Sequence, residues 1–259
     1  MLKINKIRSI TILSLTFLLT NIGLAAENRL YMFIAPSKYL MNRFVNDFKV
    51  PTSKIIYLDY GFPTHYLQPV EHKNSDIYTF GYIGTQIPSK GINLLIKAFS
   101  KIEKKAILKI WGRTNGQSTT ALKNLSRRSK NKIQFCGEYI NQNLAVEVFS
   151  KIDSIVVPSI WGENSPLVIH EAQACKIPVI TADFGGMKEY VEHKKNGLLF
   201  THRNENDLTK KLIYAIENPK KLQDFGNVGY LYSKTGEVPN IKEHCNELTE
   251  IYKRVIEKK

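Results

Sequence analysis

The amino-acid sequence predicts a Rossmann-like α/β fold, in which a parallel β-sheet carries helices on both faces. From about residue 77 onwards, short runs of β-branched and aromatic residues alternate with longer segments whose apolar residues recur at helical spacing. The run at 155–157 is continuously apolar, as expected of a strand that is buried on both faces. Strands that alternate with helices in this way form βαβ units, whose strands lie parallel in one sheet.

The elements are expected in a regular order along the chain. Predicted strands occupy residues 77–83, 106–111, 132–136, 154–157, 178–181 and 197–200. Predicted helices occupy residues 92–102, 121–128, 144–149, 166–175 and 207–216. The carboxyl ends of parallel strands share one edge of a sheet, and ligands of such folds bind there. The segments 84–90, 112–116, 137–139, 158–166 and 183–187 are therefore expected to form one rim.

The two ends of the chain are less regular. Before residue 70 the sequence shows no complete βαβ unit, although a helix is expected to begin within 35–40 and a strand at 54–59. At the other end, 241–256 is expected to form an amphipathic helix with an apolar stripe of Leu248, Ile251, Tyr252 and Val255. No unit of the chain is expected to cover this stripe, so it should promote association with a partner, a membrane or a second copy.

The net charge of +14 indicates an anionic partner for part of the surface. Twelve Lys or Arg residues stand against the single acid Glu103 across residues 90–132. Such a segment attracts nucleic acid, an anionic membrane surface or phosphorylated ligands, although solvated helix faces explain most of the charge equally well. Of these partners, nucleic acid is the least expected.

The cysteines and the N-terminus point to different compartments. Cys136, Cys175 and Cys245 are widely spaced, which indicates neither a disulfide framework nor a zinc site and favours a reducing compartment. In contrast, basic residues precede the apolar run 10–19 and small residues follow it, as in a secretory signal. Segment 1–26 is interpreted as a signal, a membrane anchor or a helix left from a preceding domain. A cytoplasmic protein, peripheral to the inner membrane face, is expected, with a secreted or anchored form left open.

A helix N-terminus is expected at one point of the rim. Ser165 is a suitable N-cap and Pro166 suits the first helical position. The free backbone N–H groups around Leu167 and Val168 would then favour an anion.

Two carboxylates bracket that predicted helix N-terminus. Glu163 precedes it in the loop, and Glu171 lies about one turn into the helix, on the face of Leu167. Carboxylates in these positions suit the hydroxyl groups of a sugar on either side of an anion. The alternative is a solvated Glu163 and a salt-bridged Glu171.

A cation and a glycine pair complete the candidate site. Lys90 stands at a predicted helix start. A cation there is repelled by the positive end of the helix dipole, unless an anion lies between the two. The alternative is that the Lys90 side chain simply reaches water. Gly185 and Gly186, followed by Met187, would let backbone amides approach a ligand closely, although a structural turn explains them equally well. Together these features suit a sugar attached to a diphosphate.

Several motifs with these residues resemble those of one enzyme family. They read GYIG at 81–84, KGINLLI at 90–96, AF at 98–99, PS at 158–159, ENSPL at 163–167, EA at 171–172, GG at 185–186 and NGLLF at 196–200, with Glu189 between the last two. In this combination the chain resembles the retaining GT-B glycosyltransferases that use a Glu-x7-Glu motif, glycosyltransferase family 4, over about residues 30–256.

This resemblance implies a role for each site residue. Lys90 and Glu163 would be catalytic, because Lys90 contacts the diphosphate leaving group and Glu163 holds a hydroxyl of the transferred sugar near its anomeric centre. Glu171 would bind the ribose hydroxyls. The full set of implied donor-binding residues is Gly84, Thr85, Lys90, Gly112, Tyr139, Glu163, Ser165, Pro166, Leu167, Val168, Glu171, Gly185, Gly186 and Met187. The donor would be a UDP-, GDP- or ADP-sugar, with no cofactor and no divalent metal.

The sequence departs from the family in two respects. Thr85 stands where the family often has Arg, which removes one cation from the diphosphate site unless Arg113 replaces it. The acceptor-binding half is also expected to be largely missing. Residues 27–70 then correspond to its end and the interdomain linker, 71–235 to the nucleotide-sugar-binding domain, and 236–259 to the C-terminal helix.

Two functions follow from this division. The first is a truncated or split glycosyltransferase that acts on a polysaccharide or lipid-linked glycan, with an acceptor-domain chain as its partner. The second is a module that binds a nucleotide sugar without transferring it alone.

Overall fold

The larger part of the chain is built on one parallel sheet. The computed structural model describes residues 32–70 and 76–257, so the apolar segment 1–26 lies outside the described residues. Six strands are hydrogen-bonded in the order β5-β4-β3-β6-β7-β8, and every neighbouring pair is parallel. Their bounds are β3 (Tyr78–Ile83), β4 (Ala106–Trp111), β5 (Lys132–Gly137), β6 (Ser154–Val157), β7 (Val179–Ala182) and β8 (Gly197–Phe200).

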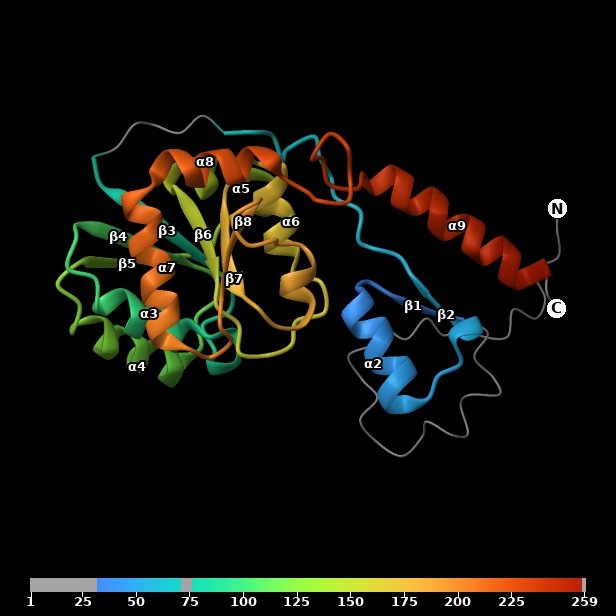
Figure 1. Ribbon diagram of the computed structural model, residues 1–259, viewed down its shortest axis with the longest axis horizontal. Helices are drawn as coiled ribbons and strands as arrows, with labels where there is room; N and C mark the ends of the chain where they lie inside the picture. Colours follow the sequence, from blue (N-terminus) through green and yellow to red (C-terminus); the bar gives the residue numbers. More distant parts are fainter. Residues whose placement is uncertain (1–31, 71–75, 258–259) are drawn as a thin grey trace.

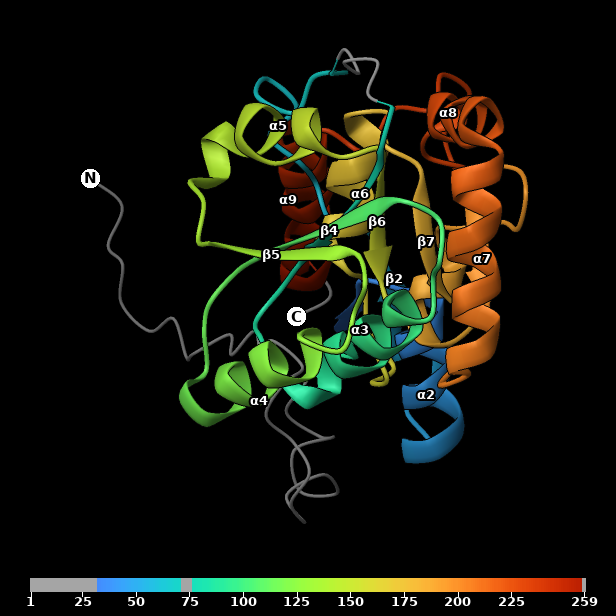
Figure 2. The same cartoon turned by 90° about the vertical axis from the view of Figure 1, so that its left-hand side faces the viewer.

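Helices cover both faces of this sheet, which confirms the predicted fold class. Figure 2 shows α3 (Ile92–Ser100) and α4 (Gly116–Ser126) on one side of the strands, and α5 (Leu144–Glu147) and α6 (Leu167–Ala174) on the other. Helix α7 (Glu205–Glu217) packs beside α3, and α8 (Pro219–Val228) follows it. Short 3-10 turns occupy η1 (Thr52–Lys54), η2 (Pro88–Lys90), η3 (Asn141–Asn143), η4 (Phe149–Lys151) and η5 (Gly185–Glu189).

Some predicted helices differ from those observed. The segment 144–149 is divided into α5 and η4, because Val148 leaves the helical region with φ −120° and ψ −64°. Helix α4 begins at Gly116, five residues earlier than expected, and α8 was not predicted at all. Leu222, Phe225 and Val228 recur at helical spacing and Leu222 is buried, so the sequence carries a short helical period there that the prediction missed.

The core of this part lies between the sheet and its helices. Strands β6 and β7 are buried throughout, as parallel strands covered on both faces must be. Phe80 of β3 is fully buried and meets Phe99 of α3 edge-on, at 6.1 Å between ring centroids. At the edge of the sheet, Lys132 and Gln134 of β5 are exposed.

A small second unit precedes the sheet, and the expectation that no βαβ unit lies before residue 70 is wrong. Strands β1 (Phe33–Ala35) and β2 (Ile55–Tyr57) are parallel and are joined through helix α2 (Lys38–Phe48), which is a βαβ arrangement. The predicted strand at 54–59 and the predicted helix start within 35–40 are confirmed by β2 and α2, whereas β1 has only three residues, too few for a periodic pattern to be recognised. Ser37 caps α2 by accepting a hydrogen bond from the Leu40 N–H at 3.1 Å.

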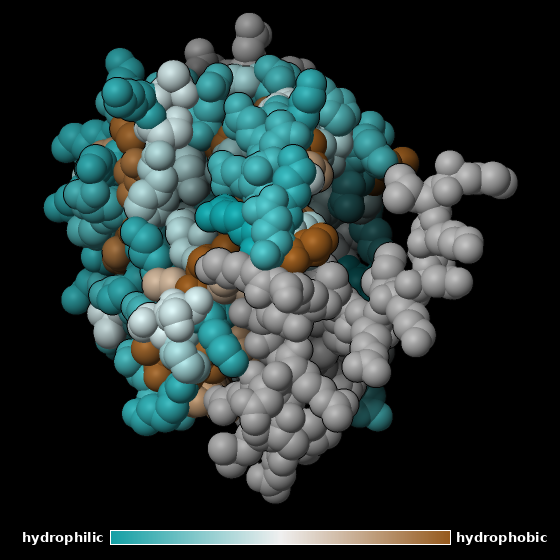
Figure 3. Space-filling view, turned by 90° about the vertical axis from the view of Figure 1, so that its right-hand side faces the viewer, coloured by the Kyte–Doolittle hydropathy of each residue, from teal (hydrophilic) through white to brown (hydrophobic). Residues whose placement is uncertain are grey.

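Helix α9 (Ile241–Glu257) confirms the predicted C-terminal helix. Its apolar stripe was expected to be uncovered, but the structure covers it in part. Ile251 is buried, whereas Leu248, Tyr252 and Val255 are half-buried. Figure 1 shows α9 extending past the small unit, and a cavity of about 530 Å³ lies between α9 and residues 56–58. The described part of this end of the molecule is largely hydrophilic (Figure 3). Within residues 32–70 and 76–257, no helix is long and apolar enough to cross a membrane.

The loop after β3 is locked against the loop after β6 by a close backbone contact. Gly91 ends η2 in the left-handed region, at φ 70°, and directly precedes α3. A Cβ atom added there would lie 1.8 Å from the carbonyl oxygen of Pro158, a distance at which the backbone must move. Only glycine satisfies both the conformation and the space.

We predict that Gly91→Ala destabilises the fold more than the matched variant Gly137→Ala. Gly137 also has a left-handed φ, of 82°, but a Cβ there would meet no atom within 4 Å. Gly137→Ala should therefore cost only the conformational term, about 1–2 kcal/mol, and Gly91→Ala about 1–3 kcal/mol more from overpacking. Urea unfolding of both variants measures the difference, and equal losses would show that the contact with Pro158 is unimportant.

Candidate functional site

The predicted rim forms at the carboxyl edge of the sheet, and hydrogen bonds join its loops. The backbone N–H of Ile160, in the loop after β6, donates to the carbonyl oxygen of Ser89 at 3.0 Å, and Ser159 Oγ donates to the same oxygen at 3.1 Å. The N–H of Gly186, after β7, donates to the carbonyl oxygen of Glu163 at 2.7 Å. The loops that contain Lys90, Glu163 and the glycine pair therefore form one connected surface.

Lys90 and Glu163, the two predicted catalytic residues, form an ion pair. Lys90 Nζ lies 2.7 Å from Glu163 Oε1, and the Glu163 side chain is only 13% exposed. Lys90 itself is 39% exposed and lies at the end of η2, immediately before the N-terminus of α3. The alternative of a solvated Glu163 is wrong, because this carboxylate is enclosed and paired.

The N-terminus of α6 faces the same rim, but its cap differs from the prediction. The helix begins at Leu167, and Pro166 is the N-cap residue, with no side chain that caps the helix. Ser165 is not the N-cap, because its side chain turns inward and its Oγ donates to Asp59 Oδ1 at 3.2 Å. The first turn therefore has no side-chain acceptor of its own, while Leu167 is half exposed and Val168 half-buried. This helix N-terminus keeps the capacity to bind an anion that a side-chain cap would reduce.

Glu171 is half-buried one turn into α6. Burial raises the pKa of Glu171 to about 7. Tyr66 and Tyr139 lie near this carboxylate. Burial, and then the negative charge of Glu171, raise the pKa of both tyrosines, and the pKa of Tyr139 reaches about 12. No Lys or Arg of the described residues forms a salt bridge with Glu171, so the alternative of a salt-bridged side chain is wrong there. The sequence does not predict Tyr66 as a site residue, because no motif distinguishes it within its segment.

The glycine pair after β7 packs tightly against the Glu163 loop. Gly185, Gly186 and Met187 are all buried. A Cβ atom on Gly186 would lie 1.7 Å from the carbonyl oxygen of Asn164. This contact gives the pair the structural role that the sequence left open, and a contact with a ligand stays a prediction.

The turns after β3 and β4 lie side by side on the rim. A Cβ atom on Gly112 would lie 2.2 Å from the carbonyl oxygen of Gly84, so these backbones are in close contact. The hydroxyl of Tyr82 donates to the carbonyl oxygen of Thr85 at 3.1 Å. Arg113 is exposed directly after Gly112, so this cation belongs to the same rim as Lys90.

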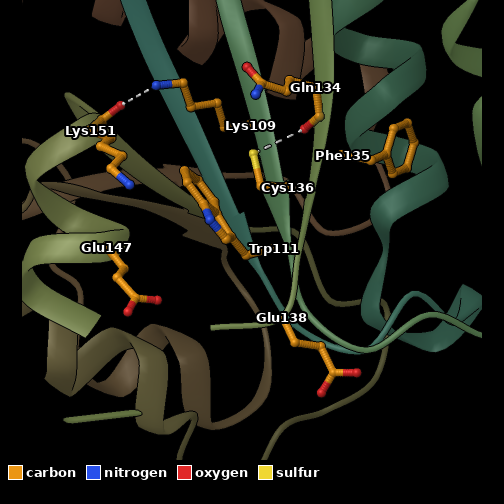
Figure 4. Close-up of a pocket in the computed structure, with 8 residues that line it drawn as sticks. All are labelled: Lys109, Trp111, Gln134, Phe135, Cys136, Glu138, Glu147 and Lys151. Carbon is orange, nitrogen blue, oxygen red and sulfur yellow. Dashed lines mark hydrogen bonds between the residues drawn. The ribbon is translucent and has the colours of Figure 1, made fainter. Parts of the chain in front are cut away.

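A separate cavity of about 480 Å³ lies over β4 and β5, beside α5 and η4 (Figure 4). Its lining residues are Lys109, Trp111, Gln134, Phe135, Cys136, Glu138, Glu147 and Lys151. None of the predicted donor-binding residues lines it, and Lys109 Nζ donates to the carbonyl oxygen of Lys151 at 3.2 Å. The described residues contain no group of three His, Cys, Asp or Glu side chains that could hold a metal ion.

The parallel sheet with helices on both faces is the Rossmann-like fold of GT-B glycosyltransferase domains. Residues 67–232 match the family described as Glycosyl transferases group 1, and the chain belongs to that family.

Two curated relatives are also named as glycosyltransferases. An uncharacterized glycosyltransferase of Methanocaldococcus jannaschii is 30% identical over 163 residues, covering 62% of this chain and 45% of the relative. An uncharacterized glycosyltransferase of Haemophilus influenzae is 29% identical over 185 residues, covering 70% of this chain and 50% of the relative. The chain thus spans about half the length of the curated relatives it matches.

Solved structures share the fold over most of the chain. A glycosyltransferase from Rickettsia africae has a TM-score of 0.77 and 20% identity, covering 93% of this chain and 69% of its own. Sucrose-phosphate synthase from Thermosynechococcus elongatus has a TM-score of 0.75 and 21% identity, covering 92% and 62%. Anabaena HepE, solved in complex with UDP-glucose, has a TM-score of 0.70 and 20% identity, covering 86% and 64%.

The raised pKa of Glu171 predicts a stability that falls as the pH rises. The ordinary pKa of glutamate is 4.5, against about 7 for folded Glu171, so between these values the folded state binds more protons than the unfolded state. Relative to Glu171→Gln, the wild-type protein should lose up to about 3 kcal/mol of unfolding free energy between about pH 4.5 and pH 8. Urea unfolding at both ends of this range checks the result. A difference between the two proteins that is independent of pH would show that Glu171 titrates normally.

Proposed function

We propose that this chain binds a nucleotide sugar at the rim and is the donor-binding part of a retaining glycosyltransferase of family 4. The observation that carries the proposal is the Lys90–Glu163 pair beside the N-terminus of α6, which has no side-chain cap. An enclosed carboxylate, a cation and free backbone N–H groups are the recognition groups of a sugar joined to a diphosphate.

Diphosphate binding would separate Lys90 from Glu163 and give each side chain a new partner in the ligand. Lys90 has a flexible side chain and substantial exposure, so its ammonium group can turn toward a diphosphate that also meets the N-terminus of α6. Glu163 then accepts a hydrogen bond from a hydroxyl of the sugar, and its negative charge lies near the anomeric centre. Glu171, deeper along the same helix, accepts hydrogen bonds from the ribose hydroxyls, with Tyr139 near the base. In this arrangement the pair holds the two side chains in place before the donor binds.

The reaction that these groups support is a front-face transfer. The oxygen of an acceptor hydroxyl forms a bond to the anomeric carbon while the bond from that carbon to the diphosphate oxygen breaks. The departing diphosphate takes the acceptor proton, and Lys90 with the α6 N-terminus stabilises its negative charge. Positioning of the acceptor beside the leaving group supplies much of the remaining acceleration. This chemistry requires no cofactor and no divalent metal.

Transfer needs an acceptor site as well as the donor site. The chain spans about half of its curated relatives, and the unit of β1, α2 and β2 lies where residues 27–70 were expected to end an acceptor domain. We propose that a polysaccharide or lipid-linked glycan accepts the sugar at the cytoplasmic face of the membrane. The second candidate, a module that binds the donor without transferring it, has less support, because the family and both curated relatives are described as glycosyltransferases.

The base and sugar are tested by a thermal-shift panel of UDP-, GDP- and ADP-glucose. A ligand that binds only the folded state raises its melting temperature. UDP-glucose is the first choice, because it is bound in the structure of the Anabaena protein. Transfer to a glycan by the chain alone separates a transferase from a binding module, whereas no shift with any of the three would contradict both.

We predict that Lys90→Ala weakens binding of the nucleoside diphosphate but leaves binding of the nucleoside nearly unchanged. The loss should be about 1.5–3 kcal/mol, as for a hydrogen bond to a charged group. Lys195→Ala is the matched control, because Lys195 also pairs with a carboxylate, Glu192, at 2.8 Å but lies in the turn before β8. Titration calorimetry measures both ligands, and equal losses for nucleoside and diphosphate would show that Lys90 has only a structural role.

We also predict that substitutions of Glu171 and Glu163 affect the binding of a nucleoside diphosphate and of its sugar derivative differently. Glu171→Gln should weaken both the nucleoside diphosphate and its sugar derivative, because the ribose is present in each. Glu163→Gln should weaken only the sugar-bearing form, by about 1.5–3 kcal/mol for one hydrogen bond to a charged acceptor. If Glu163→Gln weakened the plain diphosphate as strongly, the assignment of Glu163 to the sugar would be wrong.

A further inference from the structure

A buried carboxylate joins the segment before the sheet to helix α6. Asp59 is 7% exposed. Its Oδ1 accepts hydrogen bonds from Ser165 Oγ at 3.2 Å and from the Tyr60 N–H at 2.8 Å. Its Oδ2 accepts from His170 Nε2 at 3.0 Å and from the Tyr230 hydroxyl at 2.7 Å. Burial acts to raise the pKa of Asp59. The hydrogen bond and charge of His170, together with the hydrogen bond from the Tyr230 hydroxyl, outweigh burial, so the pKa of Asp59 is lowered.

Aromatic rings enclose this carboxylate and its histidine partner. His170 is fully buried, with the Phe62 ring stacked on it at 4.8 Å and the Tyr190 ring at 4.2 Å. Its Nδ1 lies 3.3 Å from the carbonyl oxygen of Pro166, at the N-cap of the same helix. In such an enclosure water cannot replace a lost partner, so each hydrogen bond to Asp59 strongly restrains the group that makes it.

The small unit meets the same cluster. The Tyr190 hydroxyl lies 3.0 Å from the carbonyl oxygen of Pro36 and 3.2 Å from Asp59 Oδ1, and its single hydrogen serves one of them at a time. Next to it, the Glu189 carboxylate accepts from the Lys38 N–H at 2.9 Å, at the start of α2. The linker, the small unit and α6 are therefore held at one point, close to the rim.

The two α6-side partners of Asp59 stand next to the two predicted donor carboxylates. Ser165 is two residues after Glu163, and His170 directly precedes Glu171. We propose that Asp59 is a positioning residue for the donor site, which holds the Glu163 loop through Ser165 and the Glu171 turn through His170. The inference rests on the proposed function, because it takes Glu163 and Glu171 to be the groups that contact the nucleotide sugar.

Each partner of Asp59 gives a separate test. Ser165→Ala removes the bond to the Glu163 loop, and it should weaken UDP-glucose about tenfold while changing UDP less than about twofold. Tyr230→Phe is the matched control, since it removes a hydroxyl from the same carboxylate, keeps the ring that packs on His170 at 5.6 Å, and removes no hydrogen bond to α6. It should lower the melting temperature but change the ratio of UDP to UDP-glucose affinity less than about twofold. Asp59→Asn should weaken both ligands, because it disturbs both α6-side bonds.

A double-mutant cycle distinguishes positioning from direct contact. In the Asp59→Asn background, Ser165→Ala should have almost no further effect on UDP-glucose affinity, because Ser165 acts through Asp59. If Asp59→Asn does not fold, Ser165→Ala and Tyr230→Phe alone decide, through the affinity ratio measured by calorimetry. A wild-type affinity ratio in Ser165→Ala, or the same altered ratio in Tyr230→Phe, would overturn the positioning role alone. Wild-type protein that binds none of UDP-, GDP- and ADP-glucose would instead overturn the proposed function and this inference with it.

Discussion

The candidate site depends on places where backbone meets backbone without any side chain between. Gly91 lies against Pro158, and Gly186 lies against Asn164, each too close to admit a Cβ atom. The first contact fixes the Lys90 loop to the loop after β6, and the second fixes that same loop to the turn after β7. Because these contacts leave little freedom of movement, Lys90 and Glu163 meet in a pair that the chain order alone does not require.

Beneath the rim, hydrogen bonds between buried polar side chains hold the Glu163 loop and α6 in place. Ser165 turns away from the rim to Asp59, so the N-terminus of α6 has no side-chain cap. One buried carboxylate thereby both restrains the helix and leaves its first N–H groups free for an anion. The same helix carries Glu171 in surroundings that raise its pKa to about 7, which means that burial of this side chain opposes folding near neutral pH. A destabilising group retained in this way is typical of a binding site.

The sequence predicted the sheet well because most of its strands are apolar, because four of the six, β3 to β6, end at or directly before glycine or proline, and because parallel strands must share their carboxyl edge. It placed Lys90, Glu163, Glu171 and the glycine pair on that edge. It failed for β1, whose three residues show no period, and for Ser165, which is a good N-cap by type but donates its side-chain hydrogen bond to Asp59 instead. Neither Asp59 nor Tyr66 could be singled out, because their partners lie more than a hundred residues away in the chain.

A crystal structure of the chain with the nucleotide sugar selected by thermal shift will show whether the rim binds this ligand across the Lys90–Glu163 pair. We expect the diphosphate between Lys90 and the N-terminus of α6, the ribose against Glu171, and the sugar at Glu163, with the ion pair opened. A ligand bound instead in the cavity over β4 and β5, beside Lys109 and Lys151, with Lys90 still paired to Glu163, would contradict this expectation.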